Sequence, residues 1–239
     1  MAVAGWPPRM RGAAAHRPAS AREDLALVTL ASVGIGIAFA ALGAAAERLA
    51  SVWPAEEAKR RPTGVRTVLL AMVAGLAAAG IAATSSLPWW ATAVHLVMLG
   101  LLLVLTATDL EQRRLPHLLL DPLIAIGVLF VPINPGMDPV LALIGAIAAV
   151  AFLGALALVV RGGLALGDLY LVAPIGLMLG WPATFTALFA AAFLSAATSL
   201  VLLATRRVGL RSYIPFGPFL VAGAVLTLLL DPRLLTVVR

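Results

Sequence analysis

Eight long apolar runs constrain this chain more than any other feature, because almost no charged residue interrupts them. About 20 consecutive apolar residues cross a bilayer as a helix. We expect spans at residues 25–46, 67–84, 89–108, 117–132, 139–160, 169–180, 182–204 and 214–230. The runs are continuous rather than alternating, which argues against a transmembrane β-barrel. The expected fold is therefore all-α, a polytopic membrane helix bundle with about eight transmembrane helices.

The composition agrees with a membrane protein. Charged residues make up 12% of the 239 residues and hydrophobic residues 62%, whereas soluble domains carry about 25% charged residues. Cysteine is absent, which excludes disulfides, thiol catalysis and cysteine-ligated zinc. The histidines His16, His95 and His117 are scattered and predict no metal site. We expect neither a metal nor an organic cofactor.

Two boundaries leave alternatives open. Residues 1–24 are basic, rich in Pro, Ala and Arg and without periodicity, so a disordered tail is expected before a single membrane domain at 25–239. A signal peptide is the rival interpretation, but residues 25–46 are long enough to span and no compact cleavage site follows. Trp181 and Pro182 either separate two spans, which we favour, or kink one long helix.

The loops between the spans fall into two sets by charge. The opposite loops at 85–88, 133–138 and 181 hold no Lys or Arg. The basic set contains Arg48, Lys59, Arg60, Arg61, Arg66, Arg113, Arg114, Arg161, Arg206, Arg207 and Arg211. Lys and Arg concentrate on the cytoplasmic side of membranes, so the basic loops are expected there, and the net charge of +6 requires no nucleic-acid partner. With eight spans, the basic residues 1–24 fall on the side opposite the basic loops. This is the one observation that conflicts with the expected orientation.

Asp109 and Asp168 are the leading candidates for chemistry, because each lies where an apolar run meets a polar one. Acids at a membrane boundary are costly and usually functional. Asp109 lies at the end of a span, where the helix dipole and desolvation favour the protonated acid. Asp168 begins a span, where the dipole favours the charged form. An aspartic peptidase needs this asymmetry, since one carboxylate activates water and one acid polarises the carbonyl.

Residue types alone also allow a structural role, in which the acids pair with Arg113, Arg114 or Arg161. Three segments in order point further: Asp-Leu-Glu-x-x-x-Leu-Pro at 109–116, Leu-Gly-Asp-x-x-Leu at 166–171 and Ile-Pro-Phe-Gly-Pro-Phe at 214–219. Over roughly residues 67–230 the chain resembles the type IV prepilin peptidase family, membrane aspartic peptidases of the Gly-x-Gly-Asp type. The resemblance implies that Asp109 and Asp168 are catalytic and that residues 25–239 form a membrane peptidase-like domain.

The resemblance also implies partners and a location. Its substrates would be prepilin-like proteins with a basic leader and an apolar helix, cut at the cytoplasmic face of a prokaryotic cell membrane. Bifunctional members carry a Cys-rich cytoplasmic domain and also methylate the new N-terminus. The loop after the first span is short and free of cysteine here, so a methyltransferase role is not expected.

Two residues depart from the family's second motif. Ala165 replaces its first glycine, and Tyr170 replaces its lysine. Loss of the lysine removes a cation near the two aspartates, which would raise their proton affinity or weaken substrate binding. These departures motivate an alternative function, a catalytically impaired homologue that acts as an assembly factor in a pilus or secretion system.

Several residues are expected to support the aspartates. Gly167 would let backbone and substrate approach Asp168, and Arg113 and Arg114 would orient the loop after Asp109. Asp121 lies one turn beyond His117, so it either hydrogen-bonds to His117 as an i,i+4 neighbour or serves as a third active-site acid.

Two further function classes remain. A small proton- or cation-coupled transporter would use Asp109, Asp121 and Asp168 as ion sites near the middle of the membrane. A signal-peptide-peptidase-like protease should have Tyr before the first aspartate and a late Pro-Ala-Leu motif, whereas this chain has Thr108 and Ile-Pro-Phe-Gly-Pro.

Overall fold

The computed structural model describes residues 19–53, 63–159, 165–209 and 214–237. These residues form only helices and connecting loops, so the all-α expectation is confirmed. The α-helices are α1 (Ala19–Ala50), α2 (Val65–Thr84), α3 (Trp89–Gln112), α4 (His117–Phe130), α5 (Pro139–Val159), α6 (Leu166–Leu179), α7 (Ala183–Ala204) and α8 (Gly217–Leu230). Two short 3-10 helices, η1 (Val131–Ile133) and η2 (Pro232–Leu235), follow α4 and α8.

Five helices, α1, α2, α3, α5 and α7, are long and apolar enough to cross a membrane. The other three, α4, α6 and α8, are apolar but shorter, as expected for the fourth and sixth spans, whereas the eighth was expected to be longer. The eight helices fall at the eight expected positions, and the chain is a polytopic helical bundle.

The boundaries differ from the sequence expectations by a few residues. α1 begins at Ala19, so residues 19–24 are helical rather than part of a tail, and residues 1–18 lie outside the described part of the chain. α3 continues past residue 108 to Gln112, which places Asp109 inside its last turns. The sixth and seventh spans are separate helices, because Gly180 adopts a left-handed φ of 64° after α6.

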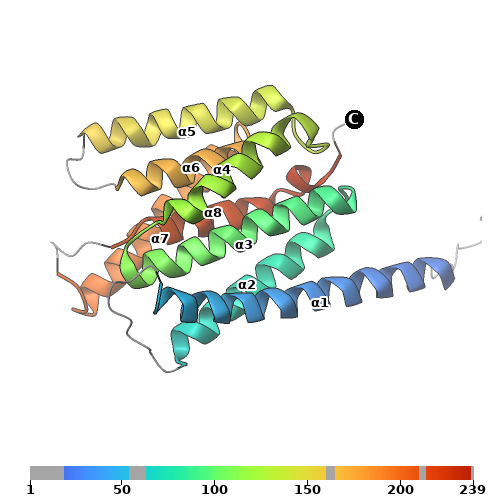
Figure 1. Ribbon diagram of the computed structural model, residues 1–239, viewed down its shortest axis with the longest axis horizontal. Coiled ribbons are helices and arrows are strands. Elements are labelled where there is room, and N and C mark those ends of the chain that lie inside the picture. The colour runs from blue at the N-terminus through green and yellow to red at the C-terminus, as the bar shows by residue number, and fades with distance from the viewer. Residues whose placement is uncertain (1–18, 54–62, 160–164, 210–213, 238–239) are drawn as a thin grey trace, which may run out of the picture.

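Consecutive helices run in opposite directions, so the connections gather at two ends of the bundle (Figure 1). α1, α3, α5 and α7 finish at the end that we call the site end, where α2, α4, α6 and α8 begin. The opposite end, called the far end, holds the 85–88 and 131–138 connections and the C-terminal segment. Asp109 and Asp168 lie on helix segments at the site end, on elements from different parts of the chain.

Three helices each contact four others: α3 contacts α1, α2, α4 and α8, α6 contacts α4, α5, α7 and α8, and α8 contacts α2, α3, α6 and α7. The closest helix pairs meet at glycines. A methyl group at Gly43 of α1 would lie 2.8 Å from the Leu70 carbonyl of α2, and one at Gly223 of α8 would lie 2.3 Å from the Ala187 carbonyl of α7. Small residues permit such backbone approach in membrane bundles, so these pairs depend on them.

Candidate active site

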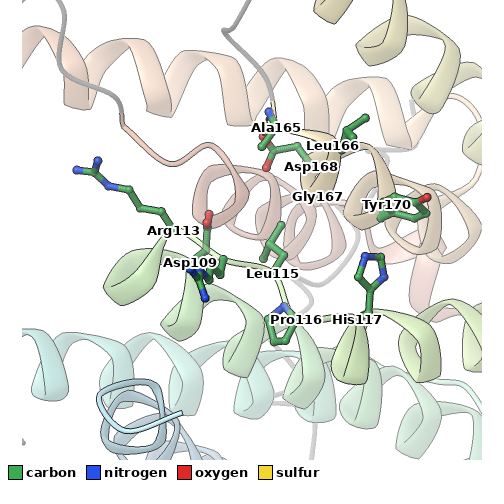
Figure 2. Close-up of a pocket in the computed structure, with 11 residues that line it drawn as sticks. Asp109, Arg113, Leu115, Pro116, His117, Ala165, Leu166, Gly167, Asp168 and Tyr170 are labelled. Carbon is green, nitrogen blue, oxygen red and sulfur yellow. Dashed lines mark hydrogen bonds between the residues drawn. The ribbon is translucent and has the colours of Figure 1, made fainter. Parts of the chain in front are cut away.

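A cavity of about 420 Å³ at the site end brings both aspartates together. It lies between the end of α3, the α3–α4 loop and the start of α6, and Figure 2 shows the two carboxyl groups pointing into this space. Asp109 is 6% exposed and Asp168 2% exposed. The lining residues are Asp109, Arg113, Arg114, Leu115, Pro116, His117, Ala165, Leu166, Gly167, Asp168 and Tyr170.

Asp109 comes from the last turns of α3, which ends when Arg113 adopts a left-handed φ of 54° and its N–H bonds to the Asp109 carbonyl. The Oδ2 atom of Asp109 is buried and accepts no hydrogen bond of good geometry among the described residues, although the Gly217 N–H lies close to the carboxyl. A buried carboxyl oxygen without a partner is costly in a structural role. It is well suited to accept or donate a proton when a reactant enters.

Asp168 comes from the first turn of α6 and is held differently. Its Oδ2 accepts a hydrogen bond of 3.3 Å from the Ala165 N–H, and its own N–H donates to the Ala165 carbonyl at 3.0 Å. The carboxylate thus satisfies a free amide at the helix N-terminus, where the helix dipole favours negative charge. Alanine in place of glycine at position 165 leaves this contact intact, because residue 165 takes part only through its backbone N–H.

The two acids line the same cavity and both are buried, so negative charges on the two carboxyl groups would repel each other. Two like charges in a buried site disfavour simultaneous ionisation. With one carboxyl held at a helix N-terminus and the other at a helix C-terminus, the state with a single shared negative charge is favoured. That charge state is the one required for acid–base chemistry by a pair of carboxyl groups.

Polar contacts hold the end of α3 in place. Arg66 of α2 forms an ion pair of 3.1 Å with Glu111 and donates a 3.0 Å hydrogen bond to the Leu110 carbonyl. Gln112 donates a hydrogen bond to the carbonyl of Ala50, the last residue of α1. These contacts are made by the three residues that follow Asp109, so they fix the turn of helix that carries it.

Two glycines let the walls of the site approach the aspartates. A methyl group at Gly217, the first residue of α8, would lie 2.6 Å from Asp109 Oδ2. A methyl group at Gly167 would lie 3.0 Å from Leu115 Cδ1. Gly167 therefore allows the α3–α4 loop to pack on the start of α6, while Gly217 leaves room for the Asp109 carboxyl.

Tyr170, at the position of the family lysine, forms one side of the cavity. Its ring meets the His117 ring edge to face, with centroids 5.2 Å apart, and Figure 2 shows the pair on the same side of the cavity. His117 Nδ1 is 3.4 Å from Asp121 Oδ1, and both side chains are exposed. Asp121 lies outside the cavity lining, so the i,i+4 pairing with His117 is the arrangement that the structure contains.

The remaining sequence candidates are placed as follows. Arg113 and Arg114 line the cavity, and the Arg113 guanidinium extends away from both carboxyl groups in Figure 2. His95 is buried near the start of α3, toward the far end of the bundle, where its Nδ1 lies 2.9 Å from the Ala91 carbonyl and its ring contacts Phe130. Arg161 lies outside the described residues. No group of three or more His, Asp or Glu side chains that could hold a metal occurs in the described ranges.

The sequence interpretation missed Gly217 and His117 as parts of the site. Gly217 belongs to the 214–219 segment, one of the three motifs of the family resemblance, and this was the only signal that could have identified it. No sequence spacing indicates that Gly217 contacts Asp109. His117 was noted only for its i,i+4 relation to Asp121. The structure adds its contact with Tyr170.

Comparison with known proteins identifies relatives of one kind. A prepilin leader peptidase/N-methyltransferase of Burkholderia pseudomallei is 35% identical over 174 residues, 71% of this chain and 56% of the relative. Proteins of the same description from Aeromonas hydrophila and Bacillus subtilis are 31% identical over 173 residues and 30% identical over 136 residues, covering 70% and 56% of this chain. The chain thus matches little more than half the length of these relatives, namely 56%, 59% and 54%.

No solved structure matches the chain. The stretch from residue 96 to residue 200 matches the type IV leader peptidase family. This stretch contains α4, α5 and α6 complete, with both cavity aspartates. The family resemblance is confirmed over residues 96–200, which contain the first two of the three motifs and are a domain of the type IV leader peptidase family.

Proposed function

We propose that this protein is a membrane-embedded aspartic endopeptidase that cleaves the leader peptides of prepilin-like or pseudopilin-like precursors. The observation that carries the proposal is the convergence of Asp109 and Asp168, buried, in one cavity at one end of the bundle. The family of residues 96–200 supports the same activity. The peptide substrate would have a basic leader followed by an apolar helix, as the family implies.

The first half of the reaction joins water to the scissile carbonyl. Asp168, held as a carboxylate at the start of α6, takes a proton from a water molecule as the water oxygen attacks the carbonyl carbon. Asp109 gives its proton to the carbonyl oxygen, so the product is a neutral gem-diol with the proton now on Asp168 and the charge on Asp109. The unpartnered Oδ2 of Asp109 is the atom best placed for this exchange.

The second half breaks the carbon–nitrogen bond. One hydroxyl of the gem-diol returns its proton to Asp109, the carbonyl re-forms, and Asp168 delivers its proton to the departing nitrogen. Both carboxyl groups then hold their starting protonation states, and the products are the leader with a new C-terminus and the mature protein with a new N-terminus. The chemistry uses no group beyond the two carboxyls and water.

Cleavage of a co-expressed prepilin-like protein, followed as a gel shift, tests the proposal. Asn keeps the shape of Asp but cannot exchange the proton, so Asp109→Asn and Asp168→Asn are each expected to abolish processing. Asp121→Asn is the matched control, because Asp121 is exposed and lies outside the cavity lining. Full processing by either cavity variant would refute the dyad, and loss of processing in Asp121→Asn would favour the third-acid alternative.

We also propose that the site end faces the cytoplasm of a prokaryotic cell. Arg48, Arg66, Arg113, Arg114, Arg206 and Arg207 lie at that end, and positive charge favours the cytoplasmic side. Because the chain has no cysteine, single cysteines can report the orientation. Val237→Cys at the far end should react with a membrane-impermeant maleimide on intact cells, and Thr205→Cys at the site end only after permeabilisation. The reverse pattern would invert the orientation.

One observation favours a second candidate, a catalytically impaired homologue that serves as an assembly factor. Tyr170 packs on His117 where the family has a lysine, so the cavity lacks that cation. This candidate predicts that wild type processes no prepilin-like substrate, while its deletion still impairs assembly and the Asp109→Asn variant restores assembly fully.

A further inference from the structure

The first turn of α8 lies against both helices that carry the cavity aspartates, since α8 contacts α3 and α6. A methyl group at Gly217 would lie 2.6 Å from Asp109 Oδ2 and 3.5 Å from Leu171 Cδ2. Leu171 is fully buried and follows Asp168 by three residues, which is about one turn of α6. The N-terminus of α8 therefore meets the helix turns that carry both carboxyl groups.

One N–H group at the start of α8 has no backbone acceptor within the described residues. The N-cap of α8 is Phe216, whose side chain cannot accept a hydrogen bond, and Pro218 has no N–H. The N–H of Phe219 bonds to the Phe216 carbonyl at 3.0 Å. The remaining N–H is that of Gly217, and the group that lies close to it is the Asp109 carboxyl.

The Gly217 N–H and the Asp109 carboxyl are adjacent but do not form a hydrogen bond of good geometry. Asp109 Oδ2 is buried and accepts no such bond within the described ranges. A helix N-terminus stabilises a negative charge beside it, and a catalytic hydrogen bond is often long until the reactants are bound. An interaction that strengthens only as charge forms lowers the barrier rather than stabilising the resting protein. The placement of Gly217 suits an interaction of that kind.

We propose that Gly217 is a positioning residue whose N–H, at the N-terminus of α8, stabilises the negative charge that Asp109 acquires during cleavage. The inference rests on the proposed peptidase function, in which Asp109 gives its proton to the carbonyl oxygen as Asp168 takes one from water. Asp168 starts with its charge beside the N-terminus of α6, where it accepts a hydrogen bond from the Ala165 N–H. The charge of the pair thus moves from one helix N-terminus to another, and the Gly217 N–H keeps its proton throughout.

A matched pair of substitutions at the N-cap of α8 tests the proposal. Phe216→Asn and Phe216→Asp remove the same ring and supply equally good capping side chains, but only Asp places a negative charge at the N-terminus of α8. We expect Phe216→Asp to cleave a purified prepilin-like polypeptide about tenfold more slowly than Phe216→Asn at neutral pH, because the added charge opposes the charge that forms on Asp109. Thermal unfolding of the two variants is expected at the same temperature.

The pH–rate profile separates this effect from damage to the fold. In the proposed reaction the rate falls at high pH, when Asp109 has already lost its proton. The added charge opposes that loss as well, so the alkaline limb of Phe216→Asp should lie about one pH unit above that of Phe216→Asn. α8 has no titratable side chain. The charged or titratable groups on the other elements around the cavity are the same in both variants, namely Glu111, Arg113, Arg114, His117, Asp168 and Tyr170.

A second pair leaves the Phe216 ring in place, so that it does not depend on the packing of that ring. Pro218→Gln and Pro218→Glu both restore an N–H in the first turn of α8 and differ in charge. The same differences in rate and in alkaline limb are expected between Pro218→Glu and Pro218→Gln.

The outcomes distinguish the role of the α8 N-terminus from the peptidase function. The expected differences within either pair support the proposal. Cleavage by wild type, with equal rates and equal alkaline limbs within both pairs, overturns the role of Gly217 and leaves the peptidase function intact. Absence of cleavage by wild type overturns the proposed function, and the role of Gly217 with it.

Discussion

The two aspartates of the cavity are the same residue in opposite settings. Asp109 ends a helix, and its Oδ2 is buried without a hydrogen bond of good geometry among the described residues. Asp168 begins a helix, and its Oδ2 caps the helix through the Ala165 N–H. In the proposed reaction, Asp168 serves both the fold and the chemistry, whereas Asp109 serves the chemistry at a cost to the fold.

The sharpest way to test this comparison is to measure activity and stability together. Asp109→Ala and Asp168→Ala should each lower cleavage by about 10²–10⁴-fold, the usual contribution of a general acid or base. Asp168→Ala should also lower the free energy of unfolding by about 1 kcal/mol, the cost of losing a helix cap. Asp109→Ala should leave it equal or raise it, because a buried unsatisfied oxygen is removed.

Both quantities can be measured on detergent-solubilised protein, by gel shift and by thermal unfolding. Asp168→Asn is the control, since the Asn side-chain oxygen can accept the same hydrogen bond from the Ala165 N–H and should recover most of the stability without the activity. A larger stability loss in Asp109→Ala than in Asp168→Ala would contradict the assignment of roles.

The next largest effect is expected at the wall that faces Asp109. Gly217→Ala places a methyl group 2.6 Å from Oδ2, so the carboxyl must rotate or α8 must shift, and we expect cleavage to fall about 10²-fold, as for a displacement of order 1 Å at a reacting group. Gly34→Ala is the matched control, because an added methyl group there meets nothing within 4 Å. Equal cleavage rates for the two variants would show that Gly217 does not set the position of Asp109.

A smaller effect is expected from restoring the family lysine on the Asp168 side. Tyr170→Lys brings a cation to the cavity wall, and we expect it to increase the rate of cleavage several-fold, in line with about 1 kcal/mol for a partly exposed charge pair. Tyr170→Phe keeps the ring against His117 and should have the wild-type rate. An unchanged rate in Tyr170→Lys would mean that a cation at this position does not assist cleavage.

The smallest effect is expected at Gly167. Its added methyl group would meet Leu115 at 3.0 Å, and a leucine side chain in a loop can yield by a few tenths of an ångström. Gly167→Ala should therefore reduce cleavage only two- to threefold, well under 1 kcal/mol in transition-state energy. An effect as large as that of Gly217→Ala would show that the glycine before Asp168 contacts the substrate itself.

The helices and the identity of the two acids could be predicted from the sequence, because apolar runs and boundary charges are local signals. The predicted positions of helix ends were less accurate. The apolar run ends at Thr108, and nothing in it indicates that α3 continues through four more residues, three of them polar, to Gln112. The contacts of Gly217 with Asp109 and of His117 with Tyr170 could not be predicted, since nothing in the helical period says which helices are neighbours.

The contacts of Arg66 with Glu111 and of Gln112 with Ala50 lie at one end of helices whose other contacts are almost wholly apolar. Apolar faces in lipid are held together by close packing alone, because lipid tails are as apolar as leucine and provide no hydrophobic drive. The polar contacts therefore act as a stop against axial slippage of α3. A slip of one residue would turn Asp109 by about 100° around the helix axis, so the alignment of the dyad depends on those few polar atoms at the membrane surface.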